Sequence, residues 1–323
     1  MDTPSPTVSI VTPAYNAERL LSDTVASVLA QTFRDFELLI VDDGSTDGTL
    51  ELARHWARTD SRVRVFTQRN GGSSAARNIG IRHSRGEYIA LLDSDDLWQP
   101  AFLATQMAIF DQHADVDVVT GNAYNLGGGF DGQPLRPAGS QWRRLSLLDI
   151  LEHEDAVCIM SVFRRSVPER IGGFDETVIH NEDYDYWIRA AHAGFSFVAN
   201  PAPLAYYRRH AESKSTNETG IIEGIVGVLR QARTLRQLQP AELAAIDRQI
   251  NRFEQERILA RAKASLRSRE FVVAAREFEA LSKLKGDFLS GAIARISRHV
   301  PQALLWAYCA KGAFRARRRL RSA

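Results

Sequence analysis

The stretch IALLDSDDLW, from Ile89 to Trp98, places three carboxylates within four positions at the end of an apolar segment: Asp93, Asp95 and Asp96. Carboxylates this close together repel one another, so a cation is expected beside them. Fixed oxygen ligands at a strand end suit Mg²⁺ or Mn²⁺, which keep open coordination positions for substrate phosphates. The alternative is a solvated acidic turn in which Asp96 caps the following helix.

A second acidic pair, Asp42 and Asp43, ends another apolar run, FELLIVDD, and a Gly-Ser-Thr-Asp-Gly segment follows it. A carboxylate at the carboxyl end of a strand can accept hydrogen bonds from a nucleobase N–H or from a ribose hydroxyl. Tyr15, which follows Pro13 in the segment TPAYN, offers an aromatic face for a base. The alternatives are a well-capped turn for DDGSTDG and ordinary strand-end packing for TPAYN.

The residues up to Asn122 alternate between strand-like and helix-like segments. Apolar, β-branched runs predict strands at Val8–Pro13, Phe36–Asp43, Val63–Phe66, Tyr88–Asp93 and Val116–Asn122. Stretches with helical periodicity lie between them, at residues 17–31, 47–59, 73–84 and 101–113. This alternation predicts an α/β fold with a Rossmann-like, mostly parallel sheet and helices on both faces. Ligands bind at the carboxyl ends of such strands, where the three polar segments lie.

Residues 126–142 are rich in glycine and proline and predict a loop. The segment GGGFDG at 127–132 matches the GxGxxG pattern of dinucleotide-binding loops. Pro134 and Pro137 interrupt the helix that this pattern requires, so we interpret the segment as a flexible loop. Further along the chain, we predict a helix at residues 182–194 and two strands, at residues 195–200 and 204–209.

The chain from Gly220 onward differs from the rest in charge and in pattern. It carries 21 Lys+Arg and 9 Asp+Glu, whereas the preceding residues carry 20 and 30. Its apolar and small residues recur at helical spacing, which predicts antiparallel helical hairpins with a faint similarity to tetratricopeptide pairs. Near the end, the apolar ALLWAY and the basic residues after it suit an anionic membrane surface. Docking to proteins and a solvated helical surface are the alternatives.

The overall composition is that of an ordinary globular protein, with 44% hydrophobic and 25% charged residues in a chain of 323. Cys158 and Cys309 form no disulfide framework or metal-binding pattern, which fits a reducing compartment. The start, MDTPSPTVSI, does not match a secretory signal, and no apolar run approaches the roughly 20 residues that span a bilayer. We therefore expect a cytoplasmic protein.

Four motifs, VSIVTPAYN, QTFRDFELLIVDDGSTDGT, NGGSSAARNIGI and GEYIALLDSDDLW, occur in this order and closely resemble family 2 glycosyltransferases of the GT-A fold. The resemblance extends approximately from Thr7 to His210. It implies a nucleotide-diphosphate sugar donor with Mg²⁺ or Mn²⁺ on its diphosphate. It also implies that Asp95 and Asp93 are the metal ligands, and that Asp93 faces the ribose or the donor sugar. The resemblance further implies donor contacts from Pro13, Tyr15, Asp42, Asp43, Arg77, Asn78 and Ser94.

For Arg77 and Asn78 the alternative is a helix start with a solvated arginine. The later segment HNEDYDYWIR, residues 180–189, matches the ED motif of the family and its trailing arginine. Sugar transfer with inversion requires a carboxylate that takes the proton of the acceptor hydroxyl. We assign this role to Asp183, with Glu182 in support. The alternative is that acids at a helix start only stabilise the helix, through a favourable interaction with its macrodipole.

Arg208 and His210 match an Arg-x-His segment that, in the family, tends to close over the donor diphosphate. His210 would contact phosphate or complete the metal shell, and an exposed loop histidine is the alternative. The domain boundaries expected from these motifs are a glycosyltransferase domain at residues 1–219 and a basic helical region at 220–323. The first domain would divide into a nucleotide-sugar half to about residue 125 and an acceptor half at residues 126–219.

We therefore expect a metal-dependent inverting glycosyltransferase of the hexosyltransferase type. UDP is the expected carrier, with GDP and dTDP as alternatives. The expected acceptor is a glycan or lipid-linked glycan in cell-surface polysaccharide or glycolipid assembly, and the basic C-terminal helix suggests peripheral attachment to the inner face of the cell membrane. No nucleic acid is expected as a partner.

Two other classes of protein are considered. A sugar-phosphate nucleotidyltransferase would carry a Gly-rich, basic phosphate loop after the first strand, and TPAYN has neither feature. A non-catalytic nucleotide-sugar-binding scaffold would not need all the expected acids, which are present.

Overall fold

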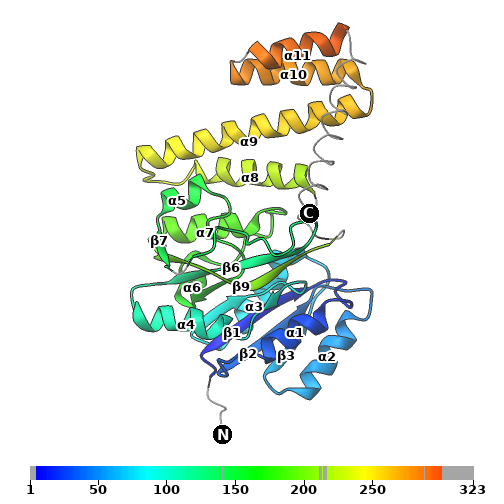
Figure 1. The fold of residues 1–323 in the computed structure, drawn as a ribbon. Helices are drawn as coiled ribbons and strands as arrows, with labels where there is room; N and C mark the ends of the chain where they lie inside the picture. The colour runs from blue at the N-terminus through cyan, green and yellow to red at the C-terminus, as the bar shows by residue number, and fades with distance from the viewer. Residues whose placement is uncertain (1–4, 140, 211–212, 214–216, 287, 300–323) are drawn as a thin grey trace. The chain divides into compact units, whose positions relative to one another are not determined.

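The computed structural model of the chain describes residues 5–139, 141–210, 213, 217–286 and 288–299 (Figure 1). The chain forms two compact units, one made of residues 1–217 and 228–246 and the other of residues 218–227 and 247–323. The expected domain boundary after residue 219 and the subdivision near residue 125 stay predictions.

The first unit is built on a single sheet. Its strands are β1 (Val8–Ala14), β2 (Phe36–Asp42), β3 (Val63–Thr67), β4 (Tyr88–Leu91), β5 (Leu97–Trp98), β6 (Val118–Gly127), β7 (Arg143–Leu145), β8 (Ser161–Arg164) and β9 (Phe197–Arg209). In the described residues, the order is β3-β2-β1-β4-β8-β6-β9-β5, with β7 paired to β9. The strands β3, β2, β1, β4, β6 and β9 share one direction. The predicted α/β fold with a mostly parallel sheet is therefore confirmed.

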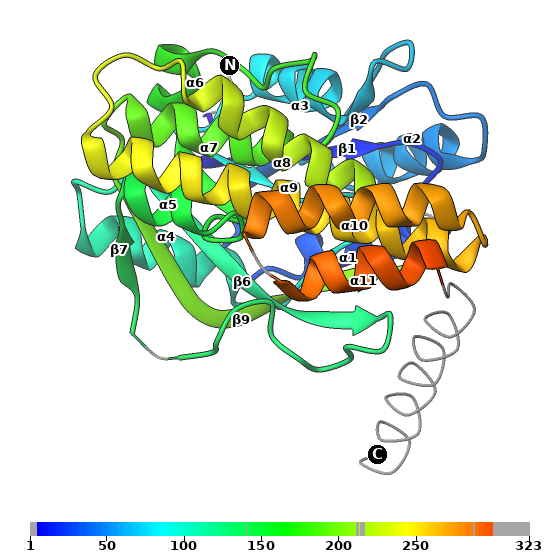
Figure 2. The same ribbon diagram turned by 90° about the horizontal axis from the view of Figure 1, so that it is seen from above.

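Helices connect the strands and cover the sheet. They are α1 (Leu21–Leu29), α2 (Thr49–Thr59), α3 (Gly72–His83), α4 (Phe102–Gln112), α5 (Leu147–Glu152), α6 (Ser166–Ile171) and α7 (Glu182–His192). The helix α1 packs against α2, whereas α3 packs on β1 and β2. Seen from above, α1 and α3 lie on opposite sides of β1 (Figure 2). This arrangement follows from right-handed crossovers, because the chain moves outward from β1 to β3 and then returns to β4.

The core of the sheet explains the apolar runs of the sequence. Every residue of β1 and β2 is buried, as expected for parallel strands with helices on both faces. A second group of buried side chains anchors α7, because the ring of Trp187 lies 5.6 Å from that of Phe163 on β8, and Tyr186 stacks on Phe174 at 4.2 Å. Aromatic contacts of this kind fix the position of α7 against the sheet.

The later part of the sheet differs from the predictions in two ways. β6 continues to Gly127, beyond the predicted end at Asn122, and the two strands predicted at 195–200 and 204–209 are one strand, β9. Pro201 and Pro203 lie between the two predicted strands, but β9 pairs along β6 with register irregularities near Asn122, where proline is tolerated. The GGGFDG segment is followed by non-helical chain, as predicted.

The helices described after β9 are α8 (Glu218–Ala232), α9 (Pro240–Arg267), α10 (Phe271–Lys285) and α11 (Phe288–His299). α10 and α11 lie side by side (Figures 1 and 2). Ala262, Phe278, Leu281 and Ala294 form a small core in this region. No helix among the described residues combines the length and apolar character needed to span a membrane. The ALLWAY segment and the basic residues after it lie outside the described residues, so the membrane interpretation stays a prediction.

Candidate functional site

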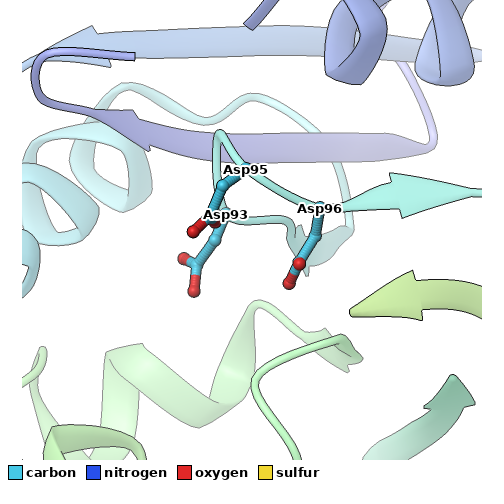
Figure 3. Close-up of side chains that lie close together, drawn as sticks. All are labelled: Asp93, Asp95 and Asp96. Atoms are coloured by element: carbon cyan, nitrogen blue, oxygen red, sulfur yellow. The ribbon is translucent and has the colours of Figure 1, made fainter. Parts of the chain in front are cut away.

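Three aspartates lie together on the turn that follows β4, with their carboxylates directed to the same side (Figure 3). One oxygen from each of Asp93, Asp95 and Asp96 lies within 4.8 Å of the other two. The side chain of Asp96 is buried, and its Oδ2 has no hydrogen-bond partner in the described part of the chain. Burial, together with the charges of Asp95 and Asp93, raises the pKa of Asp96 well above its ordinary value. A hard divalent cation would satisfy this oxygen, so the cluster fits Mg²⁺ or Mn²⁺.

Asp96 is the member of this cluster to which the family resemblance gives no metal role. Its alternative interpretation as a helix cap is wrong, because α4 begins only at Phe102 and Asp96 Oδ1 accepts a hydrogen bond from the Arg208 backbone N–H at 2.9 Å. The partner lies 112 residues away. No local pattern could have indicated this contact.

β9 delivers Arg208 and His210 to the aspartate turn. The Nε2 atom of His210 lies 3.0 Å from Asp95 Oδ2, which puts His210 at the cluster, although its predicted contact with phosphate or metal stays a prediction. The guanidinium of Arg208 donates to the Asp95 carbonyl, Asp23 Oδ2, Leu20 O and Thr24 Oγ1. These bonds tie the turn to α1, so a contact between Arg208 and the donor diphosphate would require some of them to be exchanged.

Arg77 connects the aspartate turn to the start of α7. Its Nη2 lies 2.6 Å from Asp93 Oδ1, and its Nη1 lies 2.7 Å from Glu182 Oε1. Ser73 Oγ donates to the same Glu182 oxygen at 2.7 Å. The two carboxylates raise the pKa of Arg77 against the opposing effect of its burial. Arg77 is only 4% exposed, so the interpretation as a solvated arginine is wrong.

The first turn of α7 carries two adjacent acids in different environments. Glu182 is buried and ion-paired, whereas Asp183 is partly exposed and accepts the Tyr184 backbone N–H at 2.9 Å. Burial and the neighbouring Glu182 raise the pKa of Asp183 to about 6. An accessible carboxylate with such a pKa can accept a proton near neutral pH.

Backbone strain precedes this acid pair. Asn181 adopts the left-handed conformation, with φ 61° and ψ 35°, and its buried Oδ1 has no partner among the described residues. Conformations of this kind cost free energy and gather at functional sites. Asn181 therefore marks the start of α7 as a candidate site independently of the acids.

Asp43 organises the loop that leads into α3. Its Oδ1 accepts hydrogen bonds from Gln68 Nε2 at 2.6 Å and from the Gly71 N–H at 2.8 Å, and its Oδ2 accepts one from the Gly72 N–H at 2.8 Å. This role was not predicted, since it joins a strand end to a loop 28 residues further along the chain. The contact of Asp43 with a base stays a prediction.

The other residues predicted to contact the nucleotide lie at, or just after, the ends of β1 and β2. Asp42 is buried, and its Oδ1 has no hydrogen-bond partner within the described ranges. Pro13 is buried at the end of β1, whereas the side chain of Tyr15 is 50% exposed. Asn16 ties this loop to the neighbouring one, because its Oδ1 accepts the Thr46 N–H at 2.9 Å. An exposed ring on a fixed loop suits stacking with a base.

Asn78 contacts the segment before α7. Its Nδ2 donates to Phe174 O and to Glu176 Oε1, both at 2.9 Å, and its Oδ1 accepts the Phe174 N–H at 2.8 Å. The carbonyl of Ser94 accepts a hydrogen bond from Thr24 Oγ1 at 2.8 Å. Direct contacts of Asn78 and Ser94 with the donor stay predictions, and the described contacts give both residues a part in holding the site together.

Comparisons with known proteins agree with this architecture. The family model described as glycosyl transferase family 2 matches residues 9–172. TuaG of Bacillus subtilis, whose name proposes a glycosyltransferase of teichuronic acid biosynthesis, is 33% identical over 215 residues, which are 66% of this chain and 83% of TuaG. The glycosyltransferase GlyG of Streptococcus pneumoniae is 42% identical over 119 residues, which are 36% of this chain and 39% of GlyG.

Two solved structures share the fold at low identity. TarS 1-349 of S. aureus, crystallised in complex with UDP-GlcNAc, superposes with a TM-score of 0.64 at 20% identity over 86% of this chain and 81% of its own. The mannosyltransferase PcManGT of Pyrobaculum calidifontis, in complex with GDP-Man and Mn²⁺, gives 0.62 at 19% identity over 96% of this chain and 87% of its own. The chain thus has the GT-A fold and belongs to glycosyl transferase family 2.

Proposed function

We propose that this protein is a divalent-metal-dependent, inverting glycosyltransferase that moves a sugar from a nucleotide-diphosphate sugar to an acceptor hydroxyl. The observation that carries the proposal is the link made by Arg77 between Asp93 of the aspartate cluster and Glu182, the neighbour of Asp183. Through this link, the carboxylate oxygens of the aspartate cluster, which suit a hard metal ion, lie close to Asp183, the proposed proton acceptor. Inverting transfer requires both kinds of group.

In this proposal, Asp93 and Asp95 hold the metal ion and Asp96 completes the acidic cluster. When bound, Mg²⁺ or Mn²⁺ supplies positive charge that stabilises the departing nucleoside diphosphate. His210 lies beside Asp95 and is our candidate for a further ligand or a phosphate contact. Tyr15 and the acids at the end of β2 are our candidates for recognition of the nucleoside.

The transfer step is a single displacement. The acceptor oxygen forms a bond to the anomeric carbon while the bond from that carbon to the diphosphate oxygen breaks on the opposite face, which inverts the configuration. Asp183 takes the hydroxyl proton, and the diphosphate leaves with the electron pair. The pKa of Asp183, about 6, leaves the carboxylate mostly ionised at neutral pH, ready to accept that proton.

The comparisons support the donor and acceptor classes. TarS was crystallised with UDP-GlcNAc and PcManGT with GDP-Man and Mn²⁺, and we propose UDP as the carrier. The name of TuaG supports a role in cell-surface polysaccharide assembly, so we propose a glycan or lipid-linked glycan acceptor. Its natural place would be the cytoplasmic face of the membrane, with the excess of basic residues after Gly220 as the contact.

Calorimetric titration of UDP, GDP and dTDP, each with and without Mn²⁺, tests the nucleotide site. We expect one nucleotide to bind in the presence of Mn²⁺ and this binding to disappear in Asp95→Ala, because a ligand of the ion is removed. The control is Asp60→Ala, which removes an aspartate paired with Arg62 at the end of α2. If none of the three nucleotides binds to the wild type, the proposal fails.

A further inference from the structure

Arg77 contacts acids that belong to two separate parts of the site. We infer that Arg77 is a positioning residue that couples the metal-side acid Asp93 to the start of α7, and thereby fixes Asp183 for proton transfer. This inference rests on the proposed function. In place of the expected contact with the nucleotide, it assigns the Nη1 and Nη2 atoms of Arg77 to other protein side chains.

The geometry of the guanidinium supports this role. Its two terminal nitrogens contact different carboxylates, at 2.6 Å for Asp93 and 2.7 Å for Glu182. The distance in sequence from Arg77 to Glu182 is 105 residues. A rigid, planar fork is suited to holding two carboxylates in one orientation, whereas the ammonium of lysine is a single flexible point charge.

Other contacts of α3 act on the same segment. The guanidinium of Arg77 lies 5.5 Å from the ring centroid of Phe174, and Asn78 holds the backbone of Phe174 through two hydrogen bonds. A Cβ atom added to Gly173 would lie 2.3 Å from Asn78 Oδ1, so the loop approaches α3 closely. One face of α3 therefore fixes both the loop before α7 and the first residue of α7.

The positive charge of Arg77 also stabilises the neighbouring acids. Glu182 and Asp93 both lie close enough to Asp183 for their charges to act on it, and Arg77 opposes this repulsion from a buried position. While Arg77 and Ser73 hold Glu182, Asp183 is the more accessible acid. If Arg77 is shortened, Glu182 loses a buried partner, and the direction of Asp183 is no longer fixed.

The test compares Arg77→Lys with a matched control, Arg64→Lys. Arg64 pairs with the buried Glu37 at 2.7 Å, at the start of β2 and away from the carboxyl ends of the strands. We expect Arg77→Lys to lower kcat by about 50-fold through misalignment, and to leave KM and the Kd for Mn²⁺ with UDP within about threefold. Arg64→Lys should keep kcat within about twofold, because its pair lies outside the site.

A double variant tests whether Arg77 acts through Glu182. If it does, Arg77→Lys combined with Glu182→Gln should lower kcat about as much as the more damaging single change, because both remove the same link. Independent roles would multiply the two losses and overturn the inference. Ser73→Ala, which keeps Arg77, should lower kcat by about fivefold with KM unchanged, since Glu182 loses one donor.

Three further results would overturn the inference: wild-type kcat in Arg77→Lys, a loss of nucleotide affinity as large as the loss of kcat, or, if Arg77→Lys does not fold, full activity in Ser73→Ala. The second result would make Arg77 a donor ligand. Failure of the proposed function would look different, because the wild type itself would then show neither nucleotide binding nor transfer.

Discussion

Replacing Asp183 by asparagine should affect activity and stability in opposite directions. The amide keeps the shape of the carboxyl group but cannot take a proton. We expect kcat to fall by about 10²–10⁴-fold, which is the usual contribution of a general base. Nucleotide binding should change little, because the proposed nucleotide contacts lie at the ends of β1, β2 and β4.

The effect on stability follows from the pKa of Asp183, which is about 6 in the folded protein against an ordinary value of 3.8. A raised pKa means that the protonated form is favoured by folding, so its stabilising contribution is complete below pH 4 and is lost as the pH rises through 6. For the wild type, this loss amounts to at most about 3 kcal/mol at pH 8 and about half of that at pH 5. Asparagine carries no charge and avoids the penalty.

Urea unfolding of wild type and Asp183→Asn at pH 5, 6.5 and 8 measures this difference, with tryptophan fluorescence as the signal. Trp187 is buried on the same helix and suits this purpose. The variant should be the more stable protein at pH 8, by a margin that shrinks at pH 5. The control is Asp60→Asn, which should be less stable than the wild type. The hydrogen bond from Arg62 lowers the pKa of Asp60, so the ionised carboxylate stabilises the folded protein. A margin independent of pH, or a kcat within tenfold of wild type, would refute the reasoning about Asp183.

Two further changes test the scaffold of the site. Asp43→Ala should lower the free energy of unfolding by about 1–3 kcal/mol and weaken nucleotide binding, because the N–H groups of Gly71 and Gly72 lose their acceptor; an unchanged Tm in thermal unfolding would contradict this. In Gly80→Ala, the new Cβ would lie 2.3 Å from Val11 Cγ1, so overpacking should cost about 1–3 kcal/mol. Urea unfolding measures that cost, the kcat of the folded protein should be unchanged, and wild-type stability would be the contrary result.

The sequence allowed the first half of the sheet to be predicted because its signals are local. The apolar runs that became β1, β2 and β4 are bounded by polar turns, and each is followed by a helical period. The position of β8 between β4 and β6 was not predicted, since it depends on antiparallel pairing between distant segments. For β9, the prolines at 201 and 203 carried a local signal for a break that pairing with β6 overrides.

The candidate site, too, could be predicted from the sequence only in part. The mutual repulsion of Asp93, Asp95 and Asp96 indicated a cation from the sequence itself, and their place at a strand end indicated where it would bind. The contacts of Arg77 were not predictable, because an arginine on a helix shows no sign of whether it faces solvent or two buried acids. Only the family resemblance placed Arg77 at the site, and it did not indicate its partners.

The late position of β9 in the chain has a consequence for biosynthesis. β6 and the aspartate turn leave the ribosome well before β9. β9 pairs with the edge of β6, and Arg208 and His210 at its end contact the aspartate turn. Until then, the edge of β6 is an open template for pairing with other chains. We therefore expect chains that stop before Phe197, and so lack β9, to aggregate when they are synthesised, rather than to accumulate as inactive but folded fragments.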